Sequence, residues 1–386
     1  MKRILVVINN MEIGGIQKSL LELLKALSRR NDVSVSLFCC NQCGDFLPLI
    51  PKEIEILPGN KWAQVSELSL EKCKRLGKKY YIFRVVSTLW TKLFNKKMPA
   101  NLLCHKIKSI GKYDIAISYS QPINAKAFCT LTNEIVLNCT KADRKVTFVH
   151  CDFENYGGNT KVNRKLYRKF DTIAAVSDSV GKNLAKCIPE IKDKIKTVYN
   201  FCDADEIKAL SDQNPIEYPA KTLITVARLS EEKGMIRCIP VIAKLKERNL
   251  NFEWHIVGGG GLENVIRNTI ADYGMENVIF LEGQQTNPYR YMKNADYLFL
   301  PSFHEAAPMV FDEAITLKLP ILTTNTLSAR ELVSDRNAGM VCENSEDGIY
   351  NMLYSALTAR NNCFENVNLD MRLNMAQFDA VCQLEK

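Results

Sequence analysis

Two glutamates, Glu305 and Glu313, are the strongest candidates for reactive side chains in this chain of 386 residues. They lie in the run SFHEAAPMVFDEA at 302–314, which follows an apolar run at 297–300 that is typical of a buried strand. Pro308 suits the first turn of a helix, because its fixed φ is helical and its missing N–H needs no partner there. Both carboxylates are therefore expected at the carboxyl edge of a parallel sheet, where open α/β folds bind ligands.

The predicted helix start has two interpretations. The first backbone N–H groups of a helix lack intrahelical partners and favour an anion, which would make this an anion-binding site. The alternative is an ordinary solvated helix start, where acidic residues in the first turn interact favourably with the helix dipole. The residues of this stretch leave both interpretations open.

A second group of candidates lies in the loops that follow two further predicted strands. After the strand at 222–226, the run RLSEEKG places Arg228 and Lys233 close together. Two fixed cations there could clamp a diphosphate, Arg by its planar fork and Lys as a point charge, although a solvated charged loop is the alternative. Four glycines at 258–261 follow the strand at 252–257 and permit close backbone contact with a phosphate or nucleoside.

The first half of the chain offers uncharged candidates. His150 follows the predicted strand at 145–149, and Gly14 and Gly15 follow the strand at 4–8. A hydrogen-bonded histidine at a strand end is the alternative interpretation of His150. The two adjacent glycines lack the spacing of the dinucleotide fingerprint, which argues against a nicotinamide oxidoreductase.

In this order, the motifs resemble the retaining, nucleotide-sugar-dependent glycosyltransferases of family 4, of the capsule, exopolysaccharide or lipopolysaccharide type. The resemblance rests on Asn200, on RLSEEKG, on the glycines at 258–261 and on the two glutamates around EAAPMV. Where the family usually has glycine after the first glutamate, this chain has Ala306, which narrows the space for backbone rotation beside a sugar.

The resemblance implies transfer of a sugar with retention of configuration, using neither a metal nor a cofactor. The implied donor is a UDP-sugar, with a GDP-sugar second, and the implied acceptor is a saccharide or a lipid-linked oligosaccharide. The implied catalytic residues are Glu305, His150, Arg228 and Lys233. The implied donor-binding residues are Gly14, Gly15, Arg228, Lys233, Gly258, Gly259, Gly283, Glu305, Ala306, Ala307, Pro308, Met309, Val310 and Glu313.

The elements that must position these residues alternate between strands and helices, which predicts an α/β fold with parallel sheets. The length fits two domains. The resemblance implies two Rossmann-like domains facing across a cleft, the GT-B type. We expect an acceptor domain at 1–200, a polar linker at 201–219, a nucleotide-sugar-binding domain at 220–370, and a terminal helix at 371–386 that crosses back to the first domain.

The net charge of +8 is concentrated in one segment. Residues 61–112 hold thirteen Lys and Arg against two acids, a charge of +11, so the rest of the chain carries −3. Aromatic and aliphatic residues among these lysines favour a helical surface that docks on anionic lipid. A helical insertion with a solvated basic face is the second interpretation, and a nucleic-acid patch is the weakest, since no recognised nucleic-acid motif accompanies it.

The remaining composition restricts the cellular compartment that we expect for the protein. Fourteen cysteines without a secretory signal favour a reducing cytoplasm, and no apolar run is long enough to span a membrane. We therefore expect a cytoplasmic protein that is peripheral on the inner membrane face. Two rival functions stay open: a sugar-nucleotide epimerase of the same architecture, and a non-catalytic subunit that binds a nucleotide sugar.

Overall fold

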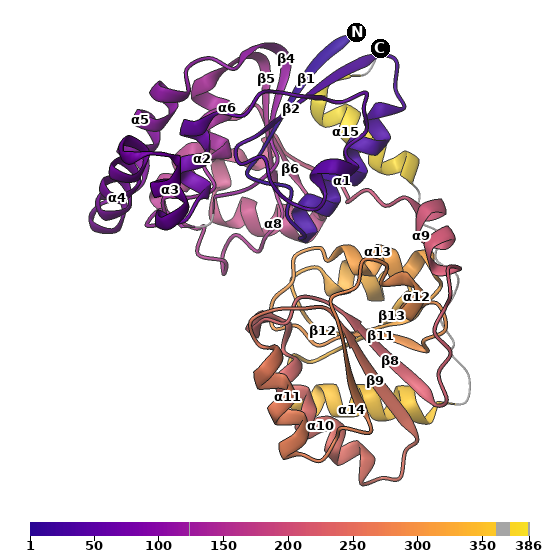
Figure 1. The fold of residues 1–386 in the computed structure, drawn as a ribbon. Helices are drawn as coiled ribbons and strands as arrows, with labels where there is room; N and C mark the ends of the chain where they lie inside the picture. The colour runs from indigo at the N-terminus through magenta and orange to yellow at the C-terminus, as the bar shows by residue number, and fades with distance from the viewer. Residues whose placement is uncertain (123, 360–370, 385–386) are drawn as a thin grey trace. The chain divides into compact units, whose positions relative to one another are not determined.

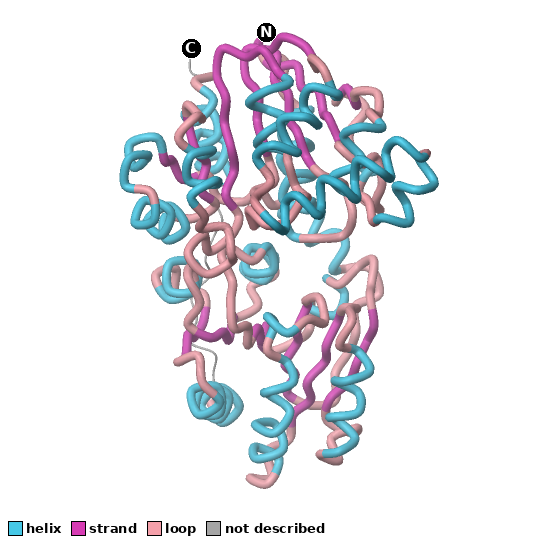
Figure 2. The backbone as a smooth tube through the Cα atoms, turned by 90° about the vertical axis from the view of Figure 1, so that its left-hand side faces the viewer, coloured by secondary structure: helices cyan, strands magenta, loops and turns pink. Residues whose placement is uncertain are grey.

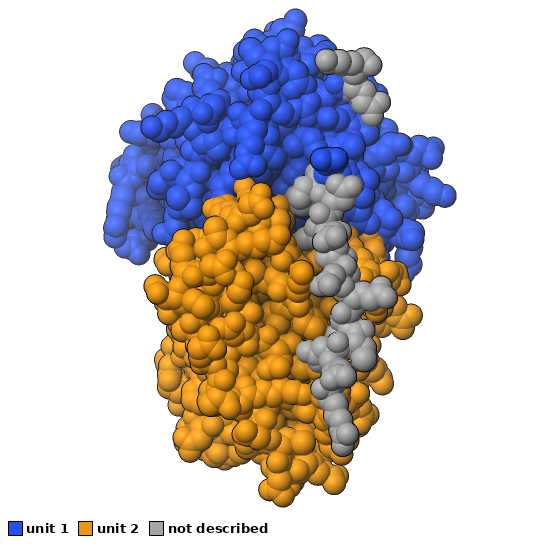
Figure 3. Space-filling model, turned by 90° about the vertical axis from the view of Figure 1, so that its right-hand side faces the viewer, with its two compact units in different colours: residues 1–201, 371–386 blue, residues 202–370 orange. Residues whose placement is uncertain are grey.

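The computed structural model describes residues 1–122, 124–359 and 371–384. The chain divides into two compact units, coloured separately in Figure 3. Unit 1 comprises Met1–Phe201 and Met371–Lys386, and unit 2 comprises Cys202–Asp370. The predicted domain boundary at residue 370 lies outside the described residues.

Unit 1 is built on a parallel sheet that, within the described residues, has seven strands in the order β3-β2-β1-β4-β5-β6-β7 (Figures 1 and 2). The strands are β1 (Lys2–Ile8), β2 (Val33–Cys39), β3 (Glu55–Ile56), β4 (Gly111–Ser118), β5 (Thr140–Val149), β6 (Thr172–Ala175) and β7 (Ile195–Thr197). The helices are α1 (Gly15–Ser28), α2 (Lys61–Glu67), α3 (Leu70–Leu76), α4 (Lys78–Leu93), α5 (Lys97–Ile107), α6 (Thr132–Cys139), α7 (Lys161–Tyr167), α8 (Asp178–Cys187) and α15 (Met371–Cys382).

The core of unit 1 follows from its apolar pattern. Ile4 to Ile8 of β1 are fully buried, as expected of a central parallel strand covered by helices on both faces. Helix α1 buries Leu20, Leu23, Leu24 and Leu27, which recur at helical spacing on one face. At the other end of the chain, α15 contacts β5, β6 and β7.

The basic segment 61–112 forms α2 to α5 and the start of β4. These helices extend outward from the sheet in layers, because α6 lies on β4 and β5, α5 lies on α6, and α4 contacts α2, α3 and α5 (Figure 1). The segment is therefore helical, as its sequence predicted.

Unit 2 is built on a second parallel sheet whose described strands follow the order β10-β9-β8-β11-β12-β13. The strands are β8 (Lys221–Val226), β9 (Phe252–Val257), β10 (Ile279–Gly283), β11 (Tyr297–Leu300), β12 (Ile321–Thr324) and β13 (Gly339–Cys342). The helices are α9 (Ala204–Ser211), α10 (Met235–Lys246), α11 (Glu263–Asp272), α12 (Tyr289–Met292), α13 (Met309–Thr316) and α14 (Glu346–Thr358), with short 3₁₀ and π turns at Glu231–Lys233 and Arg330–Ser334.

Each sheet has one point where the strand order reverses direction. The chain moves from β1 to β3 toward one edge and then starts again beside β1 with β4; in unit 2 it moves from β8 to β10 and starts again beside β8 with β11. The loops that follow the two strands at such a point diverge to opposite faces of the sheet, which leaves a crevice at their carboxyl ends. Among the predicted site residues, Gly14 and Gly15 follow β1, Arg228 and Lys233 follow β8, and Glu305 follows β11. His150 follows β5, and Gly258 follows β9.

Two local predictions differ from the structure. Residues 201–219 are not simply a linker, because α9 forms there and packs against α12 and α13. Asp203 caps α9 by accepting a hydrogen bond from the Glu206 N–H at 3.1 Å. Helix α13 begins at Met309, so Pro308 occupies the N-cap with an extended ψ of 128° and not the first helical turn.

Candidate active site

The loops after β8 and β11 meet at the reversal point of unit 2. Gly234 has a φ of +68°, and a Cβ atom there would lie 2.3 Å from the carbonyl oxygen of Pro301. The Phe303 N–H donates a hydrogen bond to the Glu232 carbonyl at 2.8 Å. The close approach and the left-handed backbone both require glycine at position 234. This contact brings the RLSEEKG loop against the loop that carries Glu305.

Lys233 and Glu305, two of the predicted catalytic residues, form a direct ion pair. Their side chains are only 18% and 11% exposed. The Ser302 hydroxyl donates to the same carboxylate oxygen, Oε1, at 2.7 Å. The carboxylate thus holds the ammonium group at the carboxyl edge of the sheet, where a stronger anion such as a diphosphate could exchange for it.

Arg237 is a functional candidate that the sequence analysis missed. Its guanidinium donates to the Pro301 carbonyl at 2.8 Å and to Asn344 Oδ1 at 2.6 Å, and it stacks 3.8 Å from the centroid of the Phe303 ring. Burial lowers the pKa of this guanidinium. Arg237 therefore fixes the loop that carries Glu305. Its position in the first turn of α10, four residues after Lys233, was the signal that could have identified it.

Arg228 is placed differently from Lys233. Its side chain is 73% exposed, and its nearest ionic partner, Glu232, lies 4.0 Å away. The structure therefore puts both predicted cations on one loop but brings only Lys233 to Glu305. Arg228 is free to reorient toward a ligand, since an exposed pair at this distance contributes little stability.

The glycine run joins the same edge through its backbone. The Gly258 N–H donates to the Gly283 carbonyl at 2.8 Å, and the Leu229 N–H donates to the Gly259 carbonyl at 2.9 Å. A Cβ atom at Gly258, whose φ is +152°, would lie 1.9 Å from the Ala227 carbonyl oxygen. Gly283 has a φ of +69°, and a Cβ atom there would meet no described atom within 4 Å. The backbone of Gly258 and Gly259 therefore contacts neighbouring strands and the loop of Arg228. The space beside the Cα atom of Gly283 is open.

Glu313 lies on α13, and the loop before this helix is largely enclosed. The Tyr289 hydroxyl donates to Glu313 Oε1 at 3.1 Å, and Glu313 is buried. Ala306, Met309 and Val310 are also buried, while Ala307 and Pro308 are partly exposed. Ala306 keeps a negative φ, so the departure from glycine introduces no backbone strain. Tyr289, which orients Glu313, was not predicted.

His150 of unit 1 is kept uncharged. Burial lowers its pKa to about 3, partly offset by a ring hydrogen bond to the Tyr119 backbone. Its Nε2 atom is enclosed and has no hydrogen-bond partner among the described residues. Since Nε2 has no partner, Nδ1 must donate to Tyr119, which leaves Nε2 as an acceptor for a hydroxyl group. The His150 N–H donates to Gln121 Oε1 at 2.6 Å.

A network of buried neutral groups supports His150. The ring of Tyr119 lies 4.9 Å from the His150 ring, and its hydroxyl is 2.8 Å from Ser19 Oγ. Ser19 in turn donates to Asn200 Oδ1 at 2.8 Å, and Asn200 accepts from Asn374 Nδ2 through its carbonyl. Asn200, one of the motif residues, is thereby tied to α1 and α15 within unit 1. Sequence reasoning could not have found Ser19 or Tyr119, because they lie 100 residues apart.

The predicted glycines of unit 1 occupy the start of α1. Gly14 is its N-cap, with a fully extended φ of −176°, and Gly15 is its first residue, with no atom near the position of a Cβ. Within the preceding loop, Asn10 Oδ1 accepts from Gln17 Nε2 at 3.0 Å. Asn9 accepts from Ser120 at 2.9 Å, which joins this loop to the one after β4.

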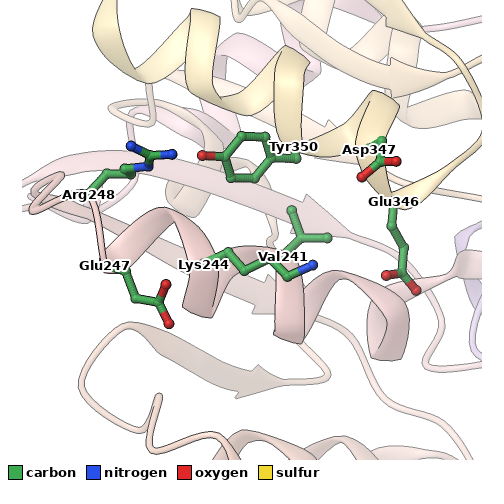
Figure 4. Close-up of a pocket in the computed structure, with 7 residues that line it drawn as sticks. All are labelled: Val241, Lys244, Glu247, Arg248, Glu346, Asp347 and Tyr350. Atoms are coloured by element: carbon green, nitrogen blue, oxygen red, sulfur yellow. The ribbon is translucent and has the colours of Figure 1, made fainter.

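A separate hollow of about 440 Å³ lies on the surface of unit 2 between α10 and α14 (Figure 4). Lys244 and Arg248 face Glu346 and Asp347 across it, and none of its lining residues is a predicted site residue. Its mixed charges favour no particular anion. Its lysine and glutamates are convenient controls for the site at the sheet edge.

Known proteins resemble this chain in sequence and in fold. Residues 206–361, which contain the second-half candidates, match the family model described as glycosyl transferases group 1. Over this segment, 156 of the 386 residues, the chain is similar to that family. Solved structures share its fold, including a crystal structure of HepE from Anabaena in complex with UDP and glucose, with a TM-score of 0.64 at 16% identity over 100% of this chain and 94% of that one. The prediction of a GT-B fold is therefore confirmed.

Two curated relatives of this chain have named activities. One is the Campylobacter jejuni N-acetylgalactosamine-N,N'-diacetylbacillosaminyl-diphospho-undecaprenol 4-alpha-N-acetylgalactosaminyltransferase, 27% identical over 241 residues, or 60% of this chain and 62% of the relative. The other is the lipopolysaccharide glucosyltransferase WaaG of Escherichia coli, 30% identical over 149 residues, or 38% of this chain and 40% of the relative. These alignments span less than two thirds of either relative.

Proposed function

We propose that this chain transfers a hexosyl group from a nucleotide sugar, with UDP-sugar as the first choice, to a saccharide acceptor in surface polysaccharide biosynthesis. The observation that carries the proposal is the meeting of the loops after β8 and β11 at the strand reversal of unit 2, where Lys233 pairs with Glu305 and the glycine run contacts the Arg228 loop. This convergence lies within the segment that matches the group 1 family. The UDP bound to HepE and the glucosyltransferase activity in the name of WaaG support the donor class.

On the donor side, each group has a distinct task in the proposal. Lys233 and Arg228 neutralise the diphosphate, together with the backbone N–H groups at the start of α13. Glu313, held by Tyr289, binds ribose hydroxyls, and Glu305 binds hydroxyls of the transferred sugar. These groups replace the charge that a metal would supply, so we propose that the enzyme needs no metal ion.

The proposed reaction retains the anomeric configuration. The bond between C1 of the sugar and the diphosphate oxygen breaks, and the oxygen keeps the electron pair. An acceptor hydroxyl forms its bond to C1 on the same face, and its proton passes to the departing phosphate oxygen. Glu305 accepts a hydrogen bond from Ser302 and is assigned to hydroxyls of the transferred sugar, so the proposed route gives it no nucleophilic role.

On the acceptor side, we propose a lipid-linked oligosaccharide at the cytoplasmic face of a membrane. The diphospho-undecaprenol in the name of the Campylobacter relative supports this acceptor class. His150 is uncharged, and its enclosed Nε2 can accept a hydrogen bond from a hydroxyl group of the acceptor sugar.

Calorimetric titration with UDP, GDP and ADP tests the donor site directly. We expect UDP to bind wild type best and Lys233→Ala to weaken this binding about tenfold or more, since a charge-assisted contact to phosphate is lost. Lys244→Ala is the matched control, because Lys244 lies in the hollow between α10 and α14, and it should bind UDP as wild type does.

Three outcomes would contradict the proposal. If wild type binds no nucleotide, the non-catalytic interpretation replaces it. If Lys233→Ala and Lys244→Ala behave alike, the site lies elsewhere on unit 2. If the enzyme converts its donor into an isomer without any acceptor, it is an epimerase.

A further inference from the structure

Helix α4 exposes apolar side chains and buries polar ones, which is the reverse of a normal surface helix. Ile82, Val86, Leu89 and Leu93 are 50%, 57%, 57% and 73% exposed. Their spacing of four, three and four residues places all four on one stripe that runs along the helix. We call these four residues the α4 stripe.

The opposite face of α4 attaches the helix to unit 1 through polar groups and through the aromatic rings of Tyr80 and Phe83. Arg84 donates to the backbone carbonyls of Ser66 and Phe128, and Ser87 and Thr91 are almost completely buried. The helix is therefore held in a defined orientation, and the exposure of the α4 stripe is not a consequence of loose packing. A solvated stripe of this kind is a recurrent mark of a docking surface.

The surroundings of the α4 stripe extend the apolar surface. Trp90 and Phe94 are 37% and 56% exposed, with ring centroids 4.7 Å apart. Helix α5, which packs against α4, exposes Met98 and Leu102. Figure 1 shows α3, α4 and α5 on the outer side of unit 1, with α2 and α6 between them and the sheet.

The charge around the α4 stripe has a single sign. No acidic residue occurs between Lys72 and Lys112. Lys78 and Lys79 lie in the first turn of α4, where a positive charge opposes the helix dipole, and Lys92 lies in its last turn. At the carboxyl end, Lys126 Nζ also donates to the carbonyls of Lys92 and Leu93 at 3.1 and 3.2 Å.

We propose that the α4 stripe docks on an anionic lipid bilayer, with α4 lying in the plane of the interface. An apolar face that enters the acyl boundary, framed by lysines at headgroup level, fits an interfacial helix of this length. A second copy of the chain fits poorly, because a two-fold interface would place the same lysines opposite one another without intervening acids. None of the described helices is long and apolar enough to cross a membrane, so docking and not spanning is proposed.

This docking goes beyond the transfer reaction and does not depend on it, so it is measured without donor or acceptor. The full chain is floated with vesicles of phosphatidylglycerol and phosphatidylcholine, and with vesicles of phosphatidylcholine alone, at physiological salt. The test variant is Leu89→Gln/Leu93→Gln, because glutamine has similar length and good helix propensity. The control is Val265→Gln/Tyr273→Gln on α11 of unit 2, whose side chains are each 46% exposed.

We expect wild type and the control to bind the anionic vesicles and to bind the neutral vesicles much more weakly. The Leu89→Gln/Leu93→Gln variant should lose at least about tenfold in its partition coefficient, because two leucine side chains no longer leave water. Its circular dichroism and unfolding midpoint should match those of wild type, since both positions are exposed.

The proposal is overturned if wild type does not bind anionic vesicles, or if the variant binds them as well as wild type does. Binding that the variant retains but high salt abolishes would show that charge alone acts and the α4 stripe does not enter the bilayer. A wild-type dimer in analytical ultracentrifugation that the variant loses would show that a second copy covers the α4 stripe instead.

Discussion

The strand-reversal points of the two units share a strand order, but they differ in the charge of the side chains around them. In unit 2, the loops after β8 and β11 carry Arg228, Lys233 and Glu305, and Arg237 lies beneath them. In unit 1, the loops after β1, β4 and β5 carry glycines, hydroxyls, amides and an uncharged histidine. The candidate site residues are therefore ionic at one sheet edge and uncharged at the other, where Glu12 and Asp152 are the acidic residues nearby in the sequence.

This difference shows how one fold provides two kinds of binding site. A parallel sheet opens a crevice at its reversal point whatever residues line it, and the side chains then select the ligand. Fixed cations suit a diphosphate, whose charge they neutralise. Neutral donors and acceptors suit sugar hydroxyls, which need directed hydrogen bonds without a charge that must be desolvated. The assignment of the donor to unit 2 and the acceptor to unit 1 rests on this contrast.

Substituting one glycine in each unit should produce the largest difference. Gly258→Ala would press a Cβ atom against the Ala227 carbonyl at a φ of +152°, so we expect a loss of about 3 kcal/mol in the free energy of unfolding. Gly15→Ala meets no atom within 4 Å and should change it by less than about 0.5 kcal/mol. Denaturant titration measures both. Equal losses would mean that Gly15 is also required by the fold, and its predicted contact with the ligand would lose support.

The charge on Glu305 should matter more for turnover than for nucleotide binding. Glu305→Gln should reduce kcat by about thirtyfold, or about 2 kcal/mol, because hydrogen bonds to a charged group are lost. UDP affinity should rise, because Lys233 loses its carboxylate partner and becomes fully available to the diphosphate. Steady-state kinetics and UDP calorimetry separate the two effects, with Glu247→Gln in the surface hollow as control. Weaker UDP binding in Glu305→Gln would refute the exchange of carboxylate for diphosphate.

The neutral histidine should give the smallest effect on turnover and a distinct dependence on pH. His150→Gln should lower kcat about fivefold, near the 1 kcal/mol of one neutral hydrogen bond, and leave UDP affinity unchanged. The folded pKa of about 3 lies below the ordinary histidine pKa of 6.5, so His150 binds fewer protons in the folded state than in the unfolded state. Its contribution to stability is therefore complete above pH 6.5 and is lost as the pH falls toward 3, by about 1.4 kcal/mol per pH unit.

The difference between the unfolding free energies of wild type and His150→Gln, measured from pH 7 to pH 4, isolates this contribution. Wild type should lose stability faster than the variant as the pH falls. Parallel curves would mean that His150 takes up a proton as readily in the folded protein as in the unfolded chain, which would contradict the lowered pKa.

Much of the fold could be predicted because its signals are local. Apolar runs such as 4–8 and 297–300 became buried strands, and leucines at helical spacing became the inner face of α1. The predicted helix boundaries were less accurate than the predicted helices themselves. Asp203 is the N-cap of α9, inside a stretch whose composition predicts a linker, and Pro308 is the N-cap of α13. A cap and a loop use the same polar residue types, so composition alone does not separate them.

The sequence by itself determined the parallel α/β architecture, the basic helical segment and the order of the motifs, since periodicity, charge and spacing are properties of neighbouring residues. Only the tertiary structure decided which motif residues meet. It joined Lys233 to Glu305 and left Arg228 exposed, it placed Arg237 under the loop, and it turned the apolar face of α4 outward. These features depend on contacts between residues distant in the chain, and such contacts are set by how helices and strands pack together.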